Sequence, residues 1–157
     1  MRLIITGWCW FIGSNFLNVF VPRYPEIQFI NLDALTYAGD HANVDLVVQQ
    51  APNYRFYQVD IRDMEDLRKI YETEQPTDII HFAAESHVDN SIKNPNIFLE
   101  TNILGTNNLL VLHKDFWLQR FHFISTDEVY GDLPLEQPEL KFTEDTPLHP
   151  HSPYSTS

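Results

Sequence analysis

The sequence predicts an α/β fold built on a doubly wound parallel sheet. Short apolar runs rich in β-branched and aromatic residues recur along the chain, and each precedes a turn and a longer stretch with helical spacing. This alternation is typical of βαβ units, in which helices cover both faces of a parallel sheet. A chain of 157 residues with 43% hydrophobic content can bury one sizeable core. We therefore expect one domain over residues 1–157.

The order of the segments predicts five strands and three main helices. The strands are expected at 3–5, 28–32, 54–59, 78–82 and 121–125, and the helices at 13–20, 64–73 and 97–116. Pro22, Pro52 and Pro76 are expected between elements, where a residue without a backbone N–H is tolerated. Residues 133–153 hold five prolines among acidic and polar residues, which predicts a loop.

Charge and composition exclude several classes of protein. Twenty-two acidic against ten basic residues give a formal net charge of −12, which repels the phosphates of nucleic acids and anionic membranes. No apolar run reaches the roughly eighteen residues of a membrane span, and Met1 and Arg2 lead directly into an apolar strand without a signal-peptide core. A cytoplasmic protein is therefore expected. The single cysteine, Cys9, excludes an internal disulfide and is interpreted as a small buried residue.

The first predicted strand, turn and helix form the context of a dinucleotide-binding loop. The strand ends at Gly7 and the helix opens near Gly13, so free N–H groups at the helix start can receive a pyrophosphate. Asp33 follows Gly13 by twenty residues, at the end of the second strand. A carboxylate there accepts hydrogen bonds from the adenosine ribose and favours NAD over NADP. The sequence thus predicts an NAD(P)-binding, Rossmann-like domain with NAD as its cofactor.

The loop TGWCWFIG (6–13) resembles that of the extended short-chain dehydrogenases, whose form is T-G-x-x-G-x-x-G. Gly7 and Gly13 match, and with Phe11 and Ile12 they are implied to bind the cofactor. Trp10 takes the place of the middle glycine, and Trp8 stands where glycine is common. An indole in either place puts cofactor binding in question. An engineered or degenerate loop, a sequence error, and a variant loop that steers both indoles away remain three open explanations.

Four further segments are similar to the dTDP-glucose 4,6-dehydratase family. They are NLDALTYAG (31–39), HFAAESHVD (81–89), ETNILGT (100–106) and ISTDEVYGD (124–132). Related epimerases and decarboxylases usually carry small or hydroxyl residues where this chain has Asp127 and Glu128, so this pair distinguishes the family. Trp117 stands where many relatives have a turn glycine, but with Phe116 and Phe121 it is interpreted as a core residue.

The resemblance implies a set of binding residues. Asp60 and Ile61 would flank the adenine, and Phe82, Ala83 and Ala84 would line the path from pyrophosphate to nicotinamide. Ser86, His87 and Asn90 are implied to lie near the nucleotide-sugar, and Thr101 and Ser125 near the cofactor. No metal is expected, because His81 and His87 have no third ligand at metal spacing and are better explained as buried or loop residues.

The resemblance also implies the chemistry. Oxidation of C4 by NAD makes the C5 hydrogen of a hexose acidic, water leaves across C5 and C6, and the hydride returns to C6. Tyr154, assisted by Thr126, would deprotonate the C4 hydroxyl. Glu128 would take the C5 proton, and Asp127 would protonate the leaving hydroxyl. The family's lysine partner of this tyrosine falls one position after Ser157, so we expect a chain truncated before that lysine and before the substrate domain, inactive by itself.

Two classes of function remain open on this basis. One is an enzyme of nucleotide-sugar and deoxysugar biosynthesis, either a dTDP-glucose 4,6-dehydratase or another epimerase or dehydratase of the superfamily. The other is a non-catalytic nucleotide-binding remnant, which the two indoles favour.

The helix predicted at 97–116 carries more apolar residues than one sheet-facing stripe requires, at Ile103, Leu104, Leu109, Leu110 and Leu112. In the family the extra face belongs to a homodimer interface, which we expect this chain to form only weakly.

Overall fold

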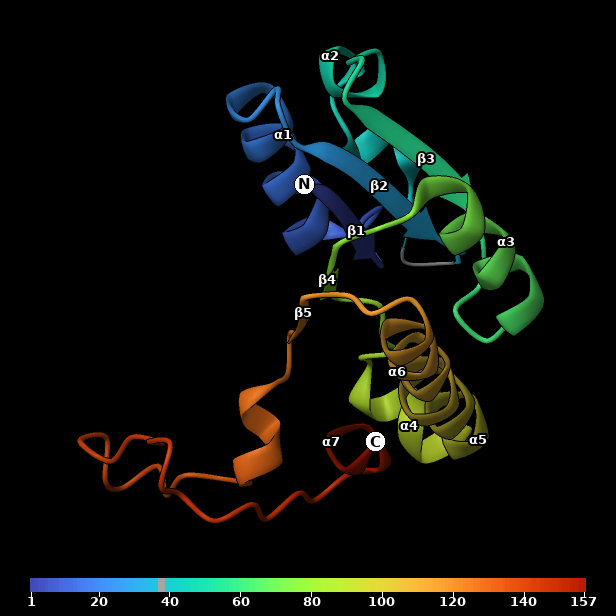
Figure 1. Ribbon diagram of the computed structural model, residues 1–157. Coiled ribbons are helices and arrows are strands. Elements are labelled where there is room, and N and C mark those ends of the chain that lie inside the picture. Colours follow the sequence, from blue (N-terminus) through green and yellow to red (C-terminus); the bar gives the residue numbers. More distant parts are fainter. Residues whose placement is uncertain (37–38) are drawn as a thin grey trace.

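The computed structural model describes residues 1–36 and 39–157, so Tyr37 and Ala38 of the segment 31–39 lie outside the described residues. The five strands form one parallel sheet in the order β3-β2-β1-β4-β5 (Figure 1). Their bounds are β1 Arg2–Thr6, β2 Gln28–Asp33, β3 Tyr54–Gln58, β4 Asp78–His81 and β5 Arg120–Phe123. The predicted parallel sheet is confirmed, and each predicted strand lies within two residues of an observed one.

Helices cover both faces of this sheet, as predicted. On one face lie α1 (Phe11–Arg23) and α2 (Leu46–Gln49), and on the other α3 (Met64–Glu74) and α6 (Thr106–Asp115). Three short helices complete the described fold: α4 (Val88–Lys93), α5 (Pro95–Phe98) and α7 (Pro153–Thr156). Single 3₁₀ turns occupy His41–Asn43 and Asp127–Tyr130. Figure 1 shows α7 beside α4, at the end of a long extended segment that follows β5.

Alternating strand residues build two hydrophobic cores. Ile4 and Ile30 face α3 and α6, whereas Leu3, Ile5 and Phe29 face α1 and α2. Successive side chains of a strand point to opposite faces, so one apolar run supplies both layers. The strand order reverses beside β1, whose neighbours are β2 and β4. In such sheets a ligand crevice lies outside the carboxyl ends of the strands at this switch point.

Two helix predictions need correction. Pro22 lies inside the last turn of α1 and not between elements, because the loss of a single N–H near a helix end still allows the turn to close. The predicted helix 97–116 begins earlier, at Pro95, and its middle section Leu99–Gly105 is π-helical. π-helical segments often occur at functional sites. The short helices α2 and α4 were not predicted, since four to six residues are too few to show helical periodicity.

Trp117 occupies a glycine position of a helix end. Leu118 N–H donates to the carbonyl of His113 at 3.0 Å and Trp117 N–H to that of Lys114 at 3.2 Å, which is the Schellman pattern that ends α6. This pattern needs a left-handed residue, and Trp117 has φ +56°. Its side chain is 88% exposed, so its predicted place in the core is wrong, whereas Leu118 beside it is buried.

Replacing Trp117 with glycine is expected to raise the free energy of unfolding by about 1 kcal/mol. A side chain at positive φ costs roughly 1–2 kcal/mol, and part of this gain is offset by the greater freedom of glycine in the unfolded chain. Urea unfolding of Trp117→Gly measures the change. Trp117→Ala is the control, because it removes the indole but keeps the strain. Equal stabilisation by alanine and glycine would contradict a backbone cause.

None of the helices in the described part of the chain has the length and apolar character that a bilayer crossing requires.

Candidate functional site

Two adjoining cavities lie at the carboxyl ends of the strands. The Asp33 cavity is lined by Asp33, Asp60, Ile61 and Thr101, among others. The Tyr154 cavity, with a volume of about 340 Å³, is lined by Ser125, Thr126 and Tyr154, among others. Both cavities share the residues Gly7, Trp10, Phe82, Ala83, Ala84 and Ser86. Most of the predicted cofactor residues therefore lie along one continuous groove.

Gly7 forms the floor of the groove and cannot carry a side chain. Its φ is +73°, and a Cβ atom would lie 2.3 Å from the Cα of Ala83. Its N–H donates to the carbonyl of Leu32 at 3.0 Å, which ties the loop to β2. Gly13 allows a second close approach, because a Cβ there would lie 2.6 Å from the Cα of Trp8. These two glycines keep the roles that a dinucleotide-binding loop gives them.

Asp33 anchors the loop as well as lining its cavity. The buried carboxylate accepts the N–H of Cys9 at 2.7 Å and that of Leu35 at 2.8 Å. Burial, reinforced by the nearby Asp33 carboxylate, raises the pKa of the Cys9 thiol to about 12. The expectation that Cys9 is a small buried residue is confirmed.

Trp8 does not enter the groove. Its side chain is fully buried in the core beneath α1, where its ring meets Phe16 and Phe82 edge-on with centroids 4.6 Å apart. The indole N–H has no hydrogen-bond partner there. Trp8 is not among the described residues with positive φ, so a side chain at this position causes no left-handed backbone strain. The explanation that the loop steers both indoles away therefore applies to Trp8 but not to Trp10, which lines both cavities.

Trp10 behaves differently, because it lines both cavities. It stands at the amino-terminal cap of α1 with extended backbone angles, φ −105° and ψ 179°, and it is 49% exposed. Its backbone is unstrained, and the residue lies where the two cavities meet. The two cavities thus adjoin at a tryptophan, at the position where a dinucleotide-binding loop has a glycine.

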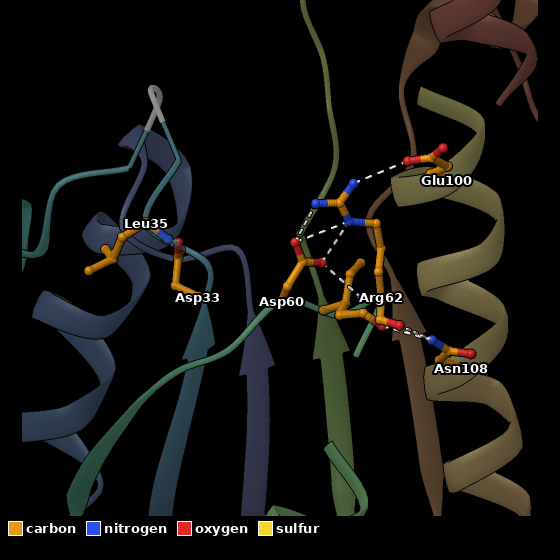
Figure 2. Close-up of polar contacts among 7 residues, drawn as sticks. Asp33, Leu35, Asp60, Arg62, Glu100 and Asn108 are labelled. Atoms are coloured by element: carbon orange, nitrogen blue, oxygen red, sulfur yellow. Dashed lines mark hydrogen bonds and ion pairs between the residues drawn. The ribbon is translucent and has the colours of Figure 1, made fainter. Parts of the chain in front are cut away.

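An ion-paired network includes two lining residues of the Asp33 cavity, Asp60 and Arg62, which follow β3 in the chain. Asp60 accepts the side chain of Arg62 at 2.6–3.0 Å through both carboxylate oxygens, and Arg62 also reaches Glu100 at 3.3 Å (Figure 2). These hydrogen bonds from Arg62 hold the pKa of Asp60 below its ordinary value. Asn108 donates to the carbonyls of Ile61 and Arg62 at 3.1 Å and fixes this turn to α6.

The predicted catalytic residues divide into two groups. Thr126 and Tyr154 line the Tyr154 cavity, and Thr126 caps the 3₁₀ turn Asp127–Tyr130 by accepting the N–H of Glu128 at 3.2 Å. In a 3₁₀ turn every third side chain shares a face, so Thr126 and Val129 face the cavity together. Asp127 and Glu128 are exposed and lie outside the lining of either cavity.

The remaining predicted residues are also divided. Ser86 lines both cavities, and Ile12 and Gly13 line the Tyr154 cavity. His87 stands directly before α4 without a side-chain capping hydrogen bond and is exposed, and neither it nor Asn90 belongs to the lining. Phe11 is exposed and also lies outside it. Among the described residues, no group of three histidine, cysteine or acidic side chains is arranged to hold a metal ion.

Sequence reasoning missed the polar residues that support the groove. Asn102 accepts the N–H of Glu85 at 2.8 Å, donates to its carbonyl at 3.0 Å, and reaches the hydroxyl of Ser157 at 2.8 Å. Beneath the groove, buried His81 lies between two hydroxyls, those of Thr6 at 2.6 Å and Thr106 at 2.8 Å. The segments 81–89 and 100–106 held these residues, but no spacing rule connects them.

The fold should lose stability in acid through His81. Burial lowers the pKa of this histidine from 6.5 to about 4. The unfolded chain therefore takes up a proton before the folded chain does. The contribution of neutral His81 to the free energy of unfolding is complete above pH 6.5. It falls by on the order of 2–3 kcal/mol as the pH drops towards 4.

Urea unfolding at pH 7 and pH 4.5 tests this expectation, with His81→Gln as the control. The variant should lose the slope in this window, whatever its stability at pH 7. The same slope in both proteins would assign the effect to other groups.

Comparison with known protein families identifies the family of the chain. A family model described as GDP-mannose 4,6 dehydratase matches residues 4–157. The chain belongs to this family. Within it, the chain is 43% identical to a dTDP-glucose 4,6-dehydratase of Haemophilus influenzae, over 100% of the chain and 48% of the relative. It is 44% identical to that of Mycobacterium tuberculosis, over 100% of the chain and 45% of the relative. The chain thus spans about half the length of these curated relatives.

Solved structures agree with this assignment. The dTDP-glucose 4,6-dehydratase DesIV of Streptomyces venezuelae, with NAD and TYD bound, matches at a TM-score of 0.86 and 43% identity, covering 99% of this chain and 48% of that one. A UDP-glucose 4-epimerase of Thermus thermophilus in complex with NAD also reaches 0.86, at 30% identity over 99% and 47%. The Rossmann-type fold and the predicted resemblance to 4,6-dehydratases are confirmed.

Proposed function

We propose that this chain is the NAD-binding half of a dTDP-glucose 4,6-dehydratase. The observation that carries the proposal is the joining of the two cavities: Tyr154 and Thr126 share one cavity with Gly7 and Ala83, and the same floor continues to Asp33. A tyrosine and a carboxylate in adjoining cavities support a cofactor site beside a sugar site. The names of the relatives supply the reaction, which removes water from dTDP-glucose to form a 4-keto-6-deoxy sugar.

The charge around the Asp33 cavity favours NAD over NADP. Its described lining contains the carboxylates of Asp33, Asp60 and Glu85, and Arg62 is its only cation. That cation is already paired with Asp60 and Glu100. A ribose 2′-phosphate would meet net negative charge, whereas ribose hydroxyls can donate to Asp33.

The proposed proton transfers use residues from two segments after β5, namely residues 126–128 and Tyr154 in α7. Tyr154 would take the proton of the C4 hydroxyl with the help of the Thr126 hydroxyl. A bound nicotinamide would accept the hydride from the sugar and later return it. Glu128 would take the C5 proton, and Asp127 would protonate the leaving C6 hydroxyl. Both carboxylates are exposed in this chain. The proposal therefore requires the remainder of the longer protein to close over them and make their surroundings unequal.

An epimerase is the second candidate, because the Thermus thermophilus epimerase matches the fold equally well. The pair Asp127 and Glu128 favours the dehydratase, since epimerisation at C4 needs no acid and base for loss of water. A non-catalytic nucleotide-binding module is the third candidate, and Trp10 in the middle of the groove favours it.

A chimaera tests the proposal. Residues 1–157 are joined to the carboxyl-terminal half of the Haemophilus influenzae relative, in the wild-type form and as Trp10→Gly, and incubated with NAD and dTDP-glucose. We expect the Trp10→Gly chimaera to give a product lighter by one water in mass spectrometry, and Glu128→Gln in that chimaera to abolish this product. The isolated chain should give no product, because it presents only part of the proposed catalytic set. A product of unchanged mass with inverted C4 would favour the epimerase, and a folded, NAD-binding chimaera without product would contradict both enzymes.

We also propose that the longer protein pairs through α6 and the π-helical segment before it. Leu109 and Leu112 are buried against the sheet, but Ile103, Leu104 and Leu110 are between 45% and 58% exposed. This second apolar face agrees with the predicted homodimer interface. An apolar strip of this kind on a soluble chain marks a contact surface.

A further inference from the structure

Trp10 stands in the place where the two halves of a dinucleotide would be joined. It lines both cavities, together with the shared floor of Gly7, Ala83 and Ala84. A dinucleotide that occupies both cavities must pass its pyrophosphate between this floor and the amino terminus of α1, where Trp10 is the cap residue. An adenine nucleoside alone needs only the Asp33 cavity.

The backbone around Trp10 is fixed on its amino-terminal side. The carbonyl of Cys9 accepts the N–H of Asp40 at 2.9 Å and the side chain of Asn43 at 2.8 Å, and the N–H of Cys9 donates to Asp33 at 2.7 Å. The neighbouring Trp8 is buried in the core. On the other side, the carbonyl of Trp10 accepts the N–H of Ser14 at 2.9 Å in the first turn of α1. Only the side-chain torsions of Trp10 therefore remain free to clear the path.

The Asp33 cavity keeps acceptors for a ribose despite its internal hydrogen bonds. A carboxylate offers about four lone-pair sites, and Asp33 uses two of them for the N–H groups of Cys9 and Leu35. Among the contacts of the described residues, two sites remain for ribose hydroxyls. Asp60, in contrast, has both oxygens engaged by Arg62.

We propose that Trp10 divides the groove, so that this chain binds an adenine nucleoside in the Asp33 cavity and discriminates against dinucleotides. This inference rests on the proposed nucleotide-binding function and goes beyond it, since it assigns to one residue a ligand preference opposite to that of an NAD enzyme. The discriminating feature is steric. Adenosine ends before the indole, whereas NAD has to displace it.

Calorimetric titration of adenosine and NAD into the wild-type chain, Trp10→Gly and Trp10→Ser tests the inference. Glycine and serine are both accepted at a helix cap, so the helix is preserved. We expect the dissociation constant of adenosine to change by less than about twofold. That of NAD should fall at least about tenfold in both variants, the equivalent of 1.4 kcal/mol. Trp117→Gly, which removes a remote indole, should change neither value.

The outcomes separate the inference from the proposed function. NAD affinity that is high and equal in wild type and variants would overturn the division of the groove but leave the NAD site in place. Tighter adenosine and NAD binding in equal measure would also overturn it, because Trp10 would then hinder the Asp33 cavity itself. Absence of binding by every ligand to every variant would overturn the inference and the nucleotide site together.

Discussion

Replacing Trp8 with alanine is expected to lower the free energy of unfolding by about 3 kcal/mol. Truncation of a fully buried tryptophan costs roughly 3–5 kcal/mol through lost transfer energy and the cavity left behind. Here the loss is reduced, because the buried indole N–H of Trp8 has no partner and its removal recovers part of that desolvation cost. The edge-on contacts of Trp8 with Phe16 and Phe82 are lost as well. Equilibrium urea unfolding at pH 7 measures the difference.

Trp10→Ala is the matched control, two positions away in the same loop. Trp10 is half-exposed, so its truncation should change the unfolding free energy by less than about 1 kcal/mol. A cost for Trp8→Ala as small as for Trp10→Ala would contradict the placement of the Trp8 ring in the core. The pair therefore tests whether the two indoles of one loop have the separate roles that the structure gives them.

Replacing Asp33 with alanine is expected to weaken adenosine binding by at least about a hundredfold. Hydrogen bonds to a charged group contribute about 1.5–3 kcal/mol each, and the ribose would lose two of them. The loop would also lose the acceptor of the Cys9 N–H, which holds its backbone at the floor of the groove. Calorimetry on the folded variant measures the effect, and circular dichroism establishes that the sheet is intact.

Asp60→Asn provides the comparison within the same cavity. The Asp60 carboxylate is already paired with Arg62, so Asp60→Asn should lower the affinity for adenosine only a few-fold. If Asp60→Asn weakened adenosine as strongly as Asp33→Ala, the ribose acceptor would have been assigned to the wrong carboxylate.

The sheet and its two helical layers could be predicted because they follow from local periodicity. Runs such as 28–32 and 78–82 carry apolar residues at successive positions and so on both faces of a strand, as strands between two helical layers must, and the stretches between them have helical spacing. The groove could be predicted for the same reason. Gly7 and Asp33 follow predicted strands and Ser125 ends one, and the carboxyl ends of parallel strands lie at one edge of the sheet.

The features that were not predicted depend on contacts between distant parts of the chain. His81 is held by Thr6, 75 residues earlier, and by Thr106 on a helix that packs on the sheet. Trp8 and Trp10 look alike in sequence, and only the space beneath α1 decides that one is buried and the other is not. The outward position of Asp127 and Glu128 follows from the threefold period of a single 3₁₀ turn, which four residues do not reveal in a sequence.

Amide chemical shifts in the ¹⁵N-labelled Trp10→Gly chain test the central claim most directly, which is that the two cavities form one NAD groove interrupted by an indole. Addition of NAD should move the amide signals of Asp33, Ile61 and Thr101 in the Asp33 cavity. It should also move those of Ser125, Thr126 and Ser155 in the Tyr154 cavity, in the same titration and with the same midpoint. Shifts confined to one cavity, or centred outside both, would contradict the account.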